Sequence, residues 1–90
     1  MRTIRWTPEA SAQFEAAIDF IQQENAAAAE NVAQSVIARI ERLASFPGLG
    51  RRGEVQGTRE LVLSPYVIVY RSTEDVVEIL YFWHGAQDWR

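Results

Sequence analysis

The chain has 90 residues, enough for one domain with an efficient core but with little room for a deep substrate cavity. Cysteine is absent and histidine occurs once, which excludes disulfides and thiolate chemistry and leads us to expect no metal site and no cofactor. All nine basic residues are arginine, yet the net charge is −3, which argues against a free-standing nucleic-acid binder.

The first half of the chain predicts a strand followed by a helical hairpin. Thr3–Trp6 has the pattern of a short strand, and Thr7 and Pro8 then start a helix, because threonine caps free backbone amides and proline fits the first helical turn. The first helix carries an apolar stripe and stops near Asn25, which can also cap the next helix. The second helix is expected from about Ala26 to Ser45, after which the sequence FPGLG breaks it.

The second half predicts an antiparallel meander. After a glycine-rich loop that carries Arg51 and Arg52, three runs rich in β-branched and aromatic residues follow, and turn residues separate them. These runs are Thr58–Leu63, Tyr66–Arg71 and Val76–Trp83. Both sides of the last run are apolar, so we expect it to lie inside the sheet, with the helical hairpin on one face.

The alternation of side chains along the three strands predicts the composition of the two faces of the sheet. One face would hold Arg59, Leu61, Leu63, Tyr66, Ile68, Tyr70, Val77, Ile79, Tyr81 and Trp83. The other face would hold Glu60, Val62, Val67, Val69, Arg71, Glu78, Leu80, Phe82 and His84.

The expected fold is an α+β domain of two layers, a helical hairpin packed on a small antiparallel sheet, in the order β-α-α-β-β-β. No linker, repeat or low-complexity tract interrupts the chain, so we expect residues 1–90 to form a single domain. No apolar run reaches the ~18 residues of a membrane span, and the N-terminus lacks the apolar core of a signal peptide. We therefore expect a cytoplasmic protein without membrane contact.

Five motifs in the chain are similar to those of the RelE/ParE superfamily, the toxins of type II toxin–antitoxin systems. They are WTPEASAQFEAAIDFI, LASFPGLGR, GTRELV, PYVIVYR and ILYFWHGAQDW, and they extend along essentially the whole chain. The resemblance implies a small toxin of a plasmid-stabilisation or addiction module, neutralised by a cognate antitoxin in a hetero-oligomer. It also implies that an extended antitoxin segment wraps the helical hairpin and the sheet, and that operator DNA is met only through the antitoxin.

The superfamily divides by target, and the residues favour one branch. RelE-like members cleave mRNA on the ribosome with a catalytic arginine directly after the first tyrosine of the strand that matches YVIVY, and this position is Val67 here. Beyond the last strand, where RelE-like members carry a basic residue, this chain has Gly85, Ala86 and Gln87. The preceding strand has Leu61 at one of the two lysine positions, and no terminal tyrosine follows. These departures resemble the ParE-like branch, which poisons DNA gyrase.

A small set of residues keeps a nuclease interpretation open. RNA cleavage needs a general base, a general acid and cations on the developing phosphate charge. His84 could be the base or the acid, oriented by Asp88, while Arg59 and Arg71 could hold the phosphate. The predicted pleat places the two arginines on opposite faces, so the trio would not converge without bending. The alternative is that His84 is the polar end of a core strand and that the arginines pair with neighbouring glutamates.

Two surfaces are candidates for partner binding. The target-binding candidates lie in the arginine-bearing loop, on the strand after it and at the C-terminal end: Arg51, Arg52, Arg59, His84, Gln87, Asp88 and Trp89. The two loop arginines are equally compatible with a solvated loop. A groove between the helices would suit an antitoxin helix, with Phe14, Ile18, Val36 and Ile37 as the antitoxin-binding candidates.

The sequence therefore favours a ParE-like toxin, a binding protein that inhibits DNA gyrase without catalytic chemistry. The alternative is a ribosome-dependent mRNA interferase of the RelE type, which is an endoribonuclease. A third interpretation is a superfamily scaffold that still binds its partner and is no longer toxic.

Overall fold

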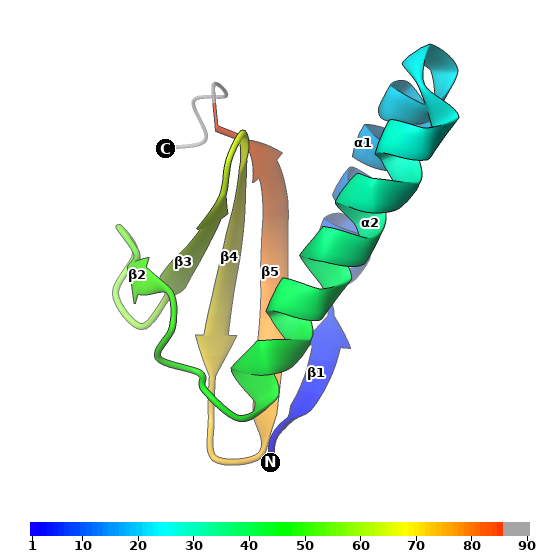
Figure 1. Cartoon of the computed structure of the whole chain (residues 1–90). Coiled ribbons are helices and arrows are strands. Elements are labelled where there is room, and N and C mark those ends of the chain that lie inside the picture. Colours follow the sequence, from blue (N-terminus) through cyan, green and yellow to red (C-terminus); the bar gives the residue numbers. More distant parts are fainter. Residues whose placement is uncertain (86–90) are drawn as a thin grey trace.

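The computed structural model describes residues 1–85, and its elements follow the predicted order with one addition (Figure 1). The elements are β1 (Thr3–Trp6), α1 (Pro8–Glu24), α2 (Ala26–Glu41), the 3-10 helix η1 (Arg42–Ala44), β2 (Arg51–Arg52), β3 (Arg59–Leu63), β4 (Tyr66–Ser72) and β5 (Val76–His84). The addition is β2, which forms inside the segment expected to be a loop. Three of the predicted site residues, Gln87, Asp88 and Trp89, lie outside the described residues.

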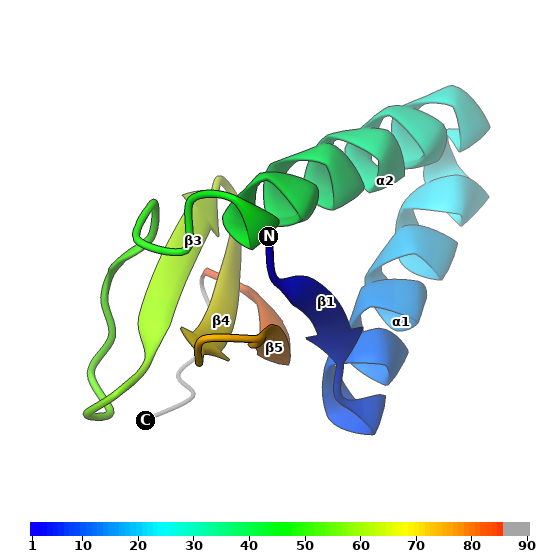
Figure 2. The same cartoon turned by 90° about the horizontal axis from the view of Figure 1, so that it is seen from below.

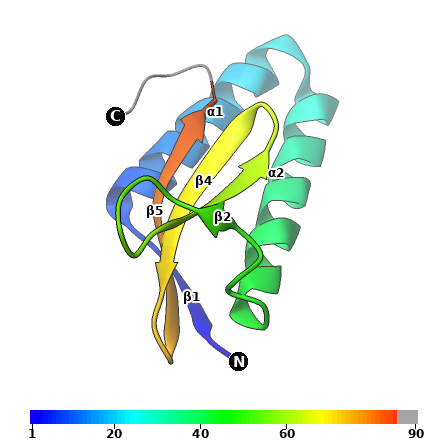
Figure 3. The same cartoon turned by 90° about the vertical axis from the view of Figure 1, so that its left-hand side faces the viewer.

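The strands form one five-stranded sheet in the order β1-β5-β4-β3-β2, and the helical hairpin covers one of its faces. Figure 2 shows the two helices on one side of β3, β4 and β5, and Figure 3 shows β2 in front with both helices behind the strands. The expected meander is confirmed, since β3, β4 and β5 pair antiparallel. The sheet as a whole is mixed rather than purely antiparallel, because β1 pairs parallel to β5. Such a pairing between distant segments leaves no trace in local periodicity.

The helix boundaries arise from the capping residues that the sequence indicated. The Thr7 hydroxyl accepts a hydrogen bond from the Ala10 N–H at 3.1 Å, and Pro8 begins α1. Asn25 ends α1 through its backbone N–H and caps α2 through its side chain, which accepts from the Ala28 N–H at 3.1 Å. The α-helix ends at Glu41 rather than near Ser45, because the last turn tightens into η1.

A β-bulge in β5 changes which side chains face the helices. Val69 lies opposite Tyr81 and Tyr70 lies opposite Ile79, so Leu80 has no partner on β4. Beyond this extra residue the alternation is inverted. Phe82 therefore packs in the core, opposite Ile68.

The predicted faces of the last four strand residues were consequently wrong. Phe82 and His84 lie on the helix face, the face covered by the hairpin, opposite Ile68 and Tyr66. Tyr81 and Trp83 lie on the open face, the other side of the sheet, and their rings stack with centroids 4.6 Å apart.

The start of α1 holds the bulge in place. The Thr7 hydroxyl that caps the helix also donates to the carbonyl oxygen of Leu80 at 3.0 Å. The side-chain oxygen of Gln13 accepts from the Phe82 N–H at 2.8 Å. Two backbone groups of β5 that lie beyond the end of β1 are thereby satisfied by side chains of the helix.

The core lies between the hairpin and the helix face of the sheet. Its buried members come from every layer: Ala10, Val36, Ile40, Leu43, Leu61, Ile68, Tyr70, Val77, Ile79 and Phe82. Neither described α-helix is long and apolar enough to cross a membrane.

One charged pair ties β2 to the sheet. Glu60 on β3 is only 3% exposed, and its Oε1 accepts from the Arg51 guanidinium at 2.9 Å and 2.8 Å. Its second oxygen, Oε2, has no hydrogen-bond donor among the described residues. The carboxylate therefore depends on a single cation for compensation.

Replacing that cation is predicted to destabilise the fold. Arg51→Met should lower the free energy of unfolding by about 2–4 kcal/mol, because it leaves a buried carboxylate without a partner. The double variant Arg51→Met/Glu60→Leu should return to within about 1 kcal/mol of the parent, because it removes the buried charge as well. Urea denaturation followed by circular dichroism measures both, and equal stability of the single variant and the parent would contradict the account.

Candidate functional site

The three residues of the nuclease interpretation are not brought together. Arg59 pairs with Tyr70 at one end of β4, and His84 pairs with Tyr66, four residues away along the same strand. Four residues of strand span about 13 Å. Arg71 follows Tyr70 and therefore points to the opposite face from Arg59, as the pleat predicted.

Each member of this trio also has other contacts. The Arg59 Nη1 donates to the carbonyl oxygen of Gly50 at 2.8 Å. The imidazole of His84 meets the ring of Tyr66 edge-on, with centroids 5.8 Å apart. Asp88, which was expected to orient that imidazole, lies outside the described residues, as do Gln87 and Trp89.

Arg71 belongs to a charged cluster on the open face. Its guanidinium contacts Oε1 of Glu78 at 2.8 Å and 2.9 Å, and Arg5 on β1 contacts Oε2 of the same carboxylate at 3.2 Å. The hydrogen bond from Arg71 is the main cause that lowers the pKa of Glu78 below its ordinary value of 4.5. The cluster links β1, β5 and β4, so Arg71 is engaged in a structural contact.

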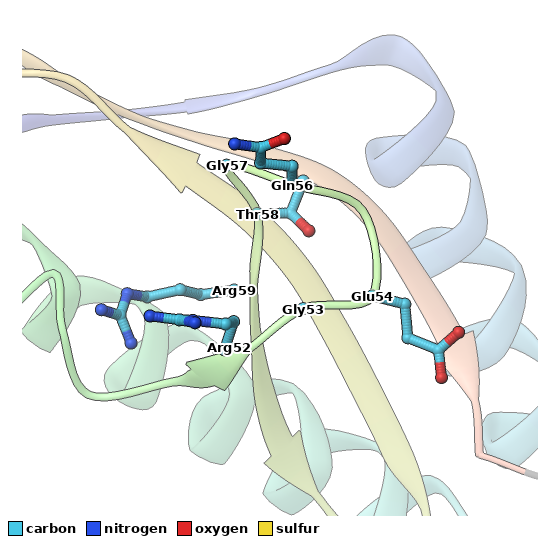
Figure 4. Close-up of a pocket in the computed structure, with 7 residues that line it drawn as sticks. All are labelled: Arg52, Gly53, Glu54, Gln56, Gly57, Thr58 and Arg59. Carbon is cyan, nitrogen blue, oxygen red and sulfur yellow. The ribbon is translucent and has the colours of Figure 1, made fainter.

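The arginine-bearing hairpin brings two further candidates side by side. Arg52 on β2 lies directly opposite Arg59 on β3. Figure 4 shows both side chains extending to the same side of the hairpin, while Glu54 points the other way. An open pocket of about 570 Å³ lies along this hairpin, and both arginines line it.

A second surface is an apolar groove at the other edge of the sheet. It has a volume of about 380 Å³ and is lined by residues of β1, α1 and α2: Ile4, Trp6, Ser11, Phe14, Glu15, Ile37, Ile40 and Glu41. The rings of Trp6 and Phe14 contact each other there, with centroids 5.3 Å apart. Two carboxylates, Glu15 and Glu41, stand at its rim.

The groove lies beside an open strand edge. On the side of β5, the Thr3 N–H donates to the carbonyl oxygen of Asp75, directly before β5, at 2.9 Å, and the Thr7 N–H donates to that of Ile79 at 3.0 Å. Because successive backbone groups of a strand point to opposite sides, the N–H groups of Ile4 and Trp6 point away from β5. β1 is the last strand on this side of the sheet. An extended segment could therefore pair with β1 while its side chains enter the groove.

The four antitoxin-binding candidates occupy different environments. Phe14 and Ile37 line the groove, and Ile37 is 43% exposed. Ile18 is half-buried on α1 and does not line the groove. Val36 is completely buried, so its side chain supports the core and is not accessible to a partner.

Several groove residues were missed by the sequence analysis. Ile4 and Trp6 were assigned only to a strand, and the rim residues Glu15 and Glu41 were not among the candidates. The sequence did contain one indication of the groove, the two large apolar side chains on the short first strand. Such side chains on an edge strand are usually covered by another segment of protein. Its neighbour could not be named, because the parallel pairing with β5 was not foreseen.

A buried tyrosine fixes the loop next to the arginine-bearing hairpin. The hydroxyl of Tyr70 donates to the carbonyl oxygen of Pro47 at 2.7 Å and accepts from the N–H of Gly50 at 2.8 Å. A Cβ on Gly50 would come within 2.7 Å of the tyrosine ring and 2.8 Å of the Glu60 carbonyl oxygen, so only glycine fits. Burial raises the pKa of Tyr70, while the Gly50 hydrogen bond and the charge of Arg59 act in the opposite direction.

Comparison with known families gives a consistent result. A model of the family described as ParE toxin of type II toxin-antitoxin system, parDE, matches residues 4–89. The protein Y4kP of Sinorhizobium fredii, whose name describes it as a toxin, is 38% identical over 90 residues, which cover 98% of this chain and 93% of the relative. Toxin RelE2 of Caulobacter vibrioides is 31% identical over 87 residues, which cover 97% of this chain and 99% of the relative.

Solved structures agree with the fold. A chain of the chromosomal ParDE toxin–antitoxin system from P. aeruginosa superposes with a TM-score of 0.81 at 26% identity, covering 93% of this chain and 96% of that chain. YafQ from E. coli superposes with a TM-score of 0.57 at 12% identity, covering 96% of both chains, and this likeness concerns the fold alone.

The two hydrogen bonds of the buried Tyr70 hydroxyl give a pH-dependent prediction. Because the folded-state pKa of Tyr70 lies above its ordinary value of 10.0, its protonated form contributes stability that is complete below pH 10 and is lost as the pH rises through the folded-state pKa. Tyr70→Phe should lower the free energy of unfolding at neutral pH by about 1–3 kcal/mol, because two buried backbone groups lose their partner. It should also reduce the loss of stability between about pH 9 and pH 11.

Urea denaturation at a series of pH values measures both effects. Tyr81→Phe, on the exposed open face, is the matched control and should leave the free energy of unfolding at neutral pH unchanged. An alkaline dependence that is the same in Tyr70→Phe as in the parent would contradict the assignment.

Proposed function

Because the chain belongs to the ParE family of toxins from type II toxin–antitoxin systems, we propose that it inhibits DNA gyrase as a binding protein and that a cognate antitoxin neutralises it. One observation supports a function without catalysis. The three side chains that a nuclease would need, His84, Arg59 and Arg71, lie apart. His84 and Arg59 are about 13 Å apart along β4, and Arg71 lies on the other face. A phosphate cannot contact all three at once.

Two further features of the described residues support this function. Val67 stands where a RelE-like toxin would carry its arginine, and its half-buried side chain cannot neutralise a phosphate. Gly85, directly after β5, offers no cation, and a Cβ there would come within 2.9 Å of the Pro65 carbonyl oxygen. A side chain at this position would therefore require the turn to move.

The second candidate function is a ribosome-dependent mRNA interferase. It is favoured by the 31% identity to a relative that carries the name RelE2. In this case His84 would serve as the acid or base and Arg59 or Arg71 as the phosphate contact.

The apolar groove supports the antitoxin part of the function. It joins an open strand edge to exposed apolar side chains, the two features that an extended or helical partner segment uses. Glu15 and Glu41 at the rim would favour basic side chains on the antitoxin segment. The groove is therefore the site at which we place the antitoxin.

The target is tested by a supercoiling assay. The purified chain is expected to inhibit gyrase-catalysed supercoiling of relaxed plasmid and to accumulate gyrase–DNA cleavage complexes, and addition of a cognate antitoxin should restore activity. His84→Ala should inhibit as well as the parent, because no proton transfer is involved.

A parallel experiment tests the second candidate function by translating a reporter mRNA on ribosomes in the presence of the purified chain. Cleavage of the mRNA that His84→Ala abolishes, with gyrase unaffected, would replace the gyrase proposal by the interferase. Normal growth on verified expression, with neither effect, would point to a partner-binding scaffold that is not toxic.

The antitoxin site is tested by a charge placed in the groove. Ile37→Asp should weaken antitoxin binding by at least about tenfold, because it puts a carboxylate into an apolar contact beside Glu41. Phe20→Asp on α1 is the matched control, since Phe20 is 68% exposed and does not line the groove. Fluorescence anisotropy of labelled antitoxin gives both dissociation constants. Equal weakening by the two substitutions would contradict the assignment.

A further inference from the structure

Among the five arginines on the described strands, Arg52 and Arg59 differ from the other three in their charge contacts. Arg5, Arg51 and Arg71 each contact a glutamate at 3.2 Å or less. Within residues 1–85, neither Arg52 nor Arg59 forms an ion pair. These two are also directly opposite each other in the ladder, an arrangement of like charges that destabilises a strand pair. The hairpin therefore carries an uncompensated pair of cations.

The local structure holds this pair in one arrangement. Gly53 follows Arg52, and its N–H donates to the carbonyl oxygen of Thr58 at 2.8 Å, which closes the hairpin next to the two arginines. A Cβ on Gly53 would come within 2.2 Å of the Thr58 hydroxyl, so the close approach requires glycine. Arg59 is fixed in turn by its hydrogen bond to Gly50. Figure 4 shows the two guanidinium groups extending in parallel from neighbouring strands.

We propose that Arg52 and Arg59 together bind carboxylates of an acidic segment on a partner protein, at the sheet edge opposite the antitoxin groove. Each guanidinium presents a planar set of donors that matches a carboxylate in a bidentate manner. A carboxylate between the two would offset their mutual repulsion as well as satisfy their donors. This inference rests on the proposed function only in taking the partner to be a protein.

The surroundings favour a protein over a nucleic acid. Two exposed apolar side chains lie in the loop before β2, whose Gly50 carbonyl oxygen accepts the hydrogen bond from Arg59. Leu49 is 48% exposed and Phe46 is 58% exposed. Arginine next to exposed apolar and aromatic side chains is the composition of a protein interface. The net charge of −3 opposes the approach of a polyanion, whereas a short acidic segment meets only the local cations.

The experiment measures binding of two labelled probes to the full chain at about 50 mM salt, where charge contacts are least screened. The first is a fluorescein-labelled peptide in which Glu–Glu pairs flank a leucine, and the second is a labelled DNA duplex. Arg52→Gln/Arg59→Gln should weaken peptide binding by at least about tenfold, since two charge-assisted contacts are lost. The control is Arg39→Gln, which removes one positive charge at an exposed position on α2. It should weaken peptide binding less than about twofold.

Two further variants separate binding from folding. Arg52→Lys/Arg59→Lys keeps both charges and loses the planar donors, and should bind the peptide with intermediate strength. Arg52→Gln alone should melt at the same temperature as the parent or higher, because it relieves the repulsion between like charges. This variant tests binding even where the double variant does not fold.

Peptide binding that is unchanged in Arg52→Gln and in the double variant would overturn the proposal. Tighter binding of the DNA duplex through the same two arginines would overturn it in favour of a nucleic-acid contact. Because neither probe involves gyrase or an antitoxin, a negative result in the supercoiling assay would leave this test unaffected.

Discussion

The structure depends on the contact between the start of α1 and the bulge of β5. The Thr7 hydroxyl accepts from the Ala10 N–H and donates to the Leu80 carbonyl oxygen, so a single side chain ends β1, begins the helix and holds the extra residue of the last strand. Without the bulge, Tyr81 and Trp83 would face the helices and Phe82 would face solvent. The place of Phe82 in the core and the aromatic pair on the open face therefore both follow from one extra residue in β5.

The parts of the fold that were predicted correctly are those with local causes. Thr7, Pro8 and Asn25 set the helix ends through contacts within a few residues, and the β-branched runs set β3, β4 and β5. The errors have non-local causes. The bulge depends on Thr7 and Gln13, which are about seventy residues from Leu80 and Phe82 in sequence. The strand β2 has only two residues, and the ion pair between Arg51 and Glu60 holds it against β3.

The sequence identified the arginines as candidates but could not separate those with structural partners from those without. Arg51 and Arg52 are adjacent in sequence, yet within the described residues Arg51 contacts Glu60 and Arg52 contacts no carboxylate. Arg71 contacts Glu78 on the neighbouring strand. Strand register decides which carboxylate contacts which guanidinium, whereas the sequence analysis predicted only the faces of the sheet, correctly for β3 and β4. The missing information was the pairing of β2, which places Arg52 opposite Arg59 and Arg51 opposite Glu60.

The two candidate surfaces lie at opposite edges of the sheet and have opposite charge. The groove at β1 is apolar with a carboxylate rim, and the hairpin at β2 carries two guanidinium groups that form no ion pair within residues 1–85. Four strand spacings of ~4.8 Å separate these edges, a width of about 19 Å. At ~3.3 Å per extended residue, a chain needs at least about six residues to cross from one edge to the other. An antitoxin seated in the groove can therefore mask the arginines directly only if an acidic segment of that length follows its groove-binding part, and a shorter antitoxin would leave the β2 edge accessible to the target.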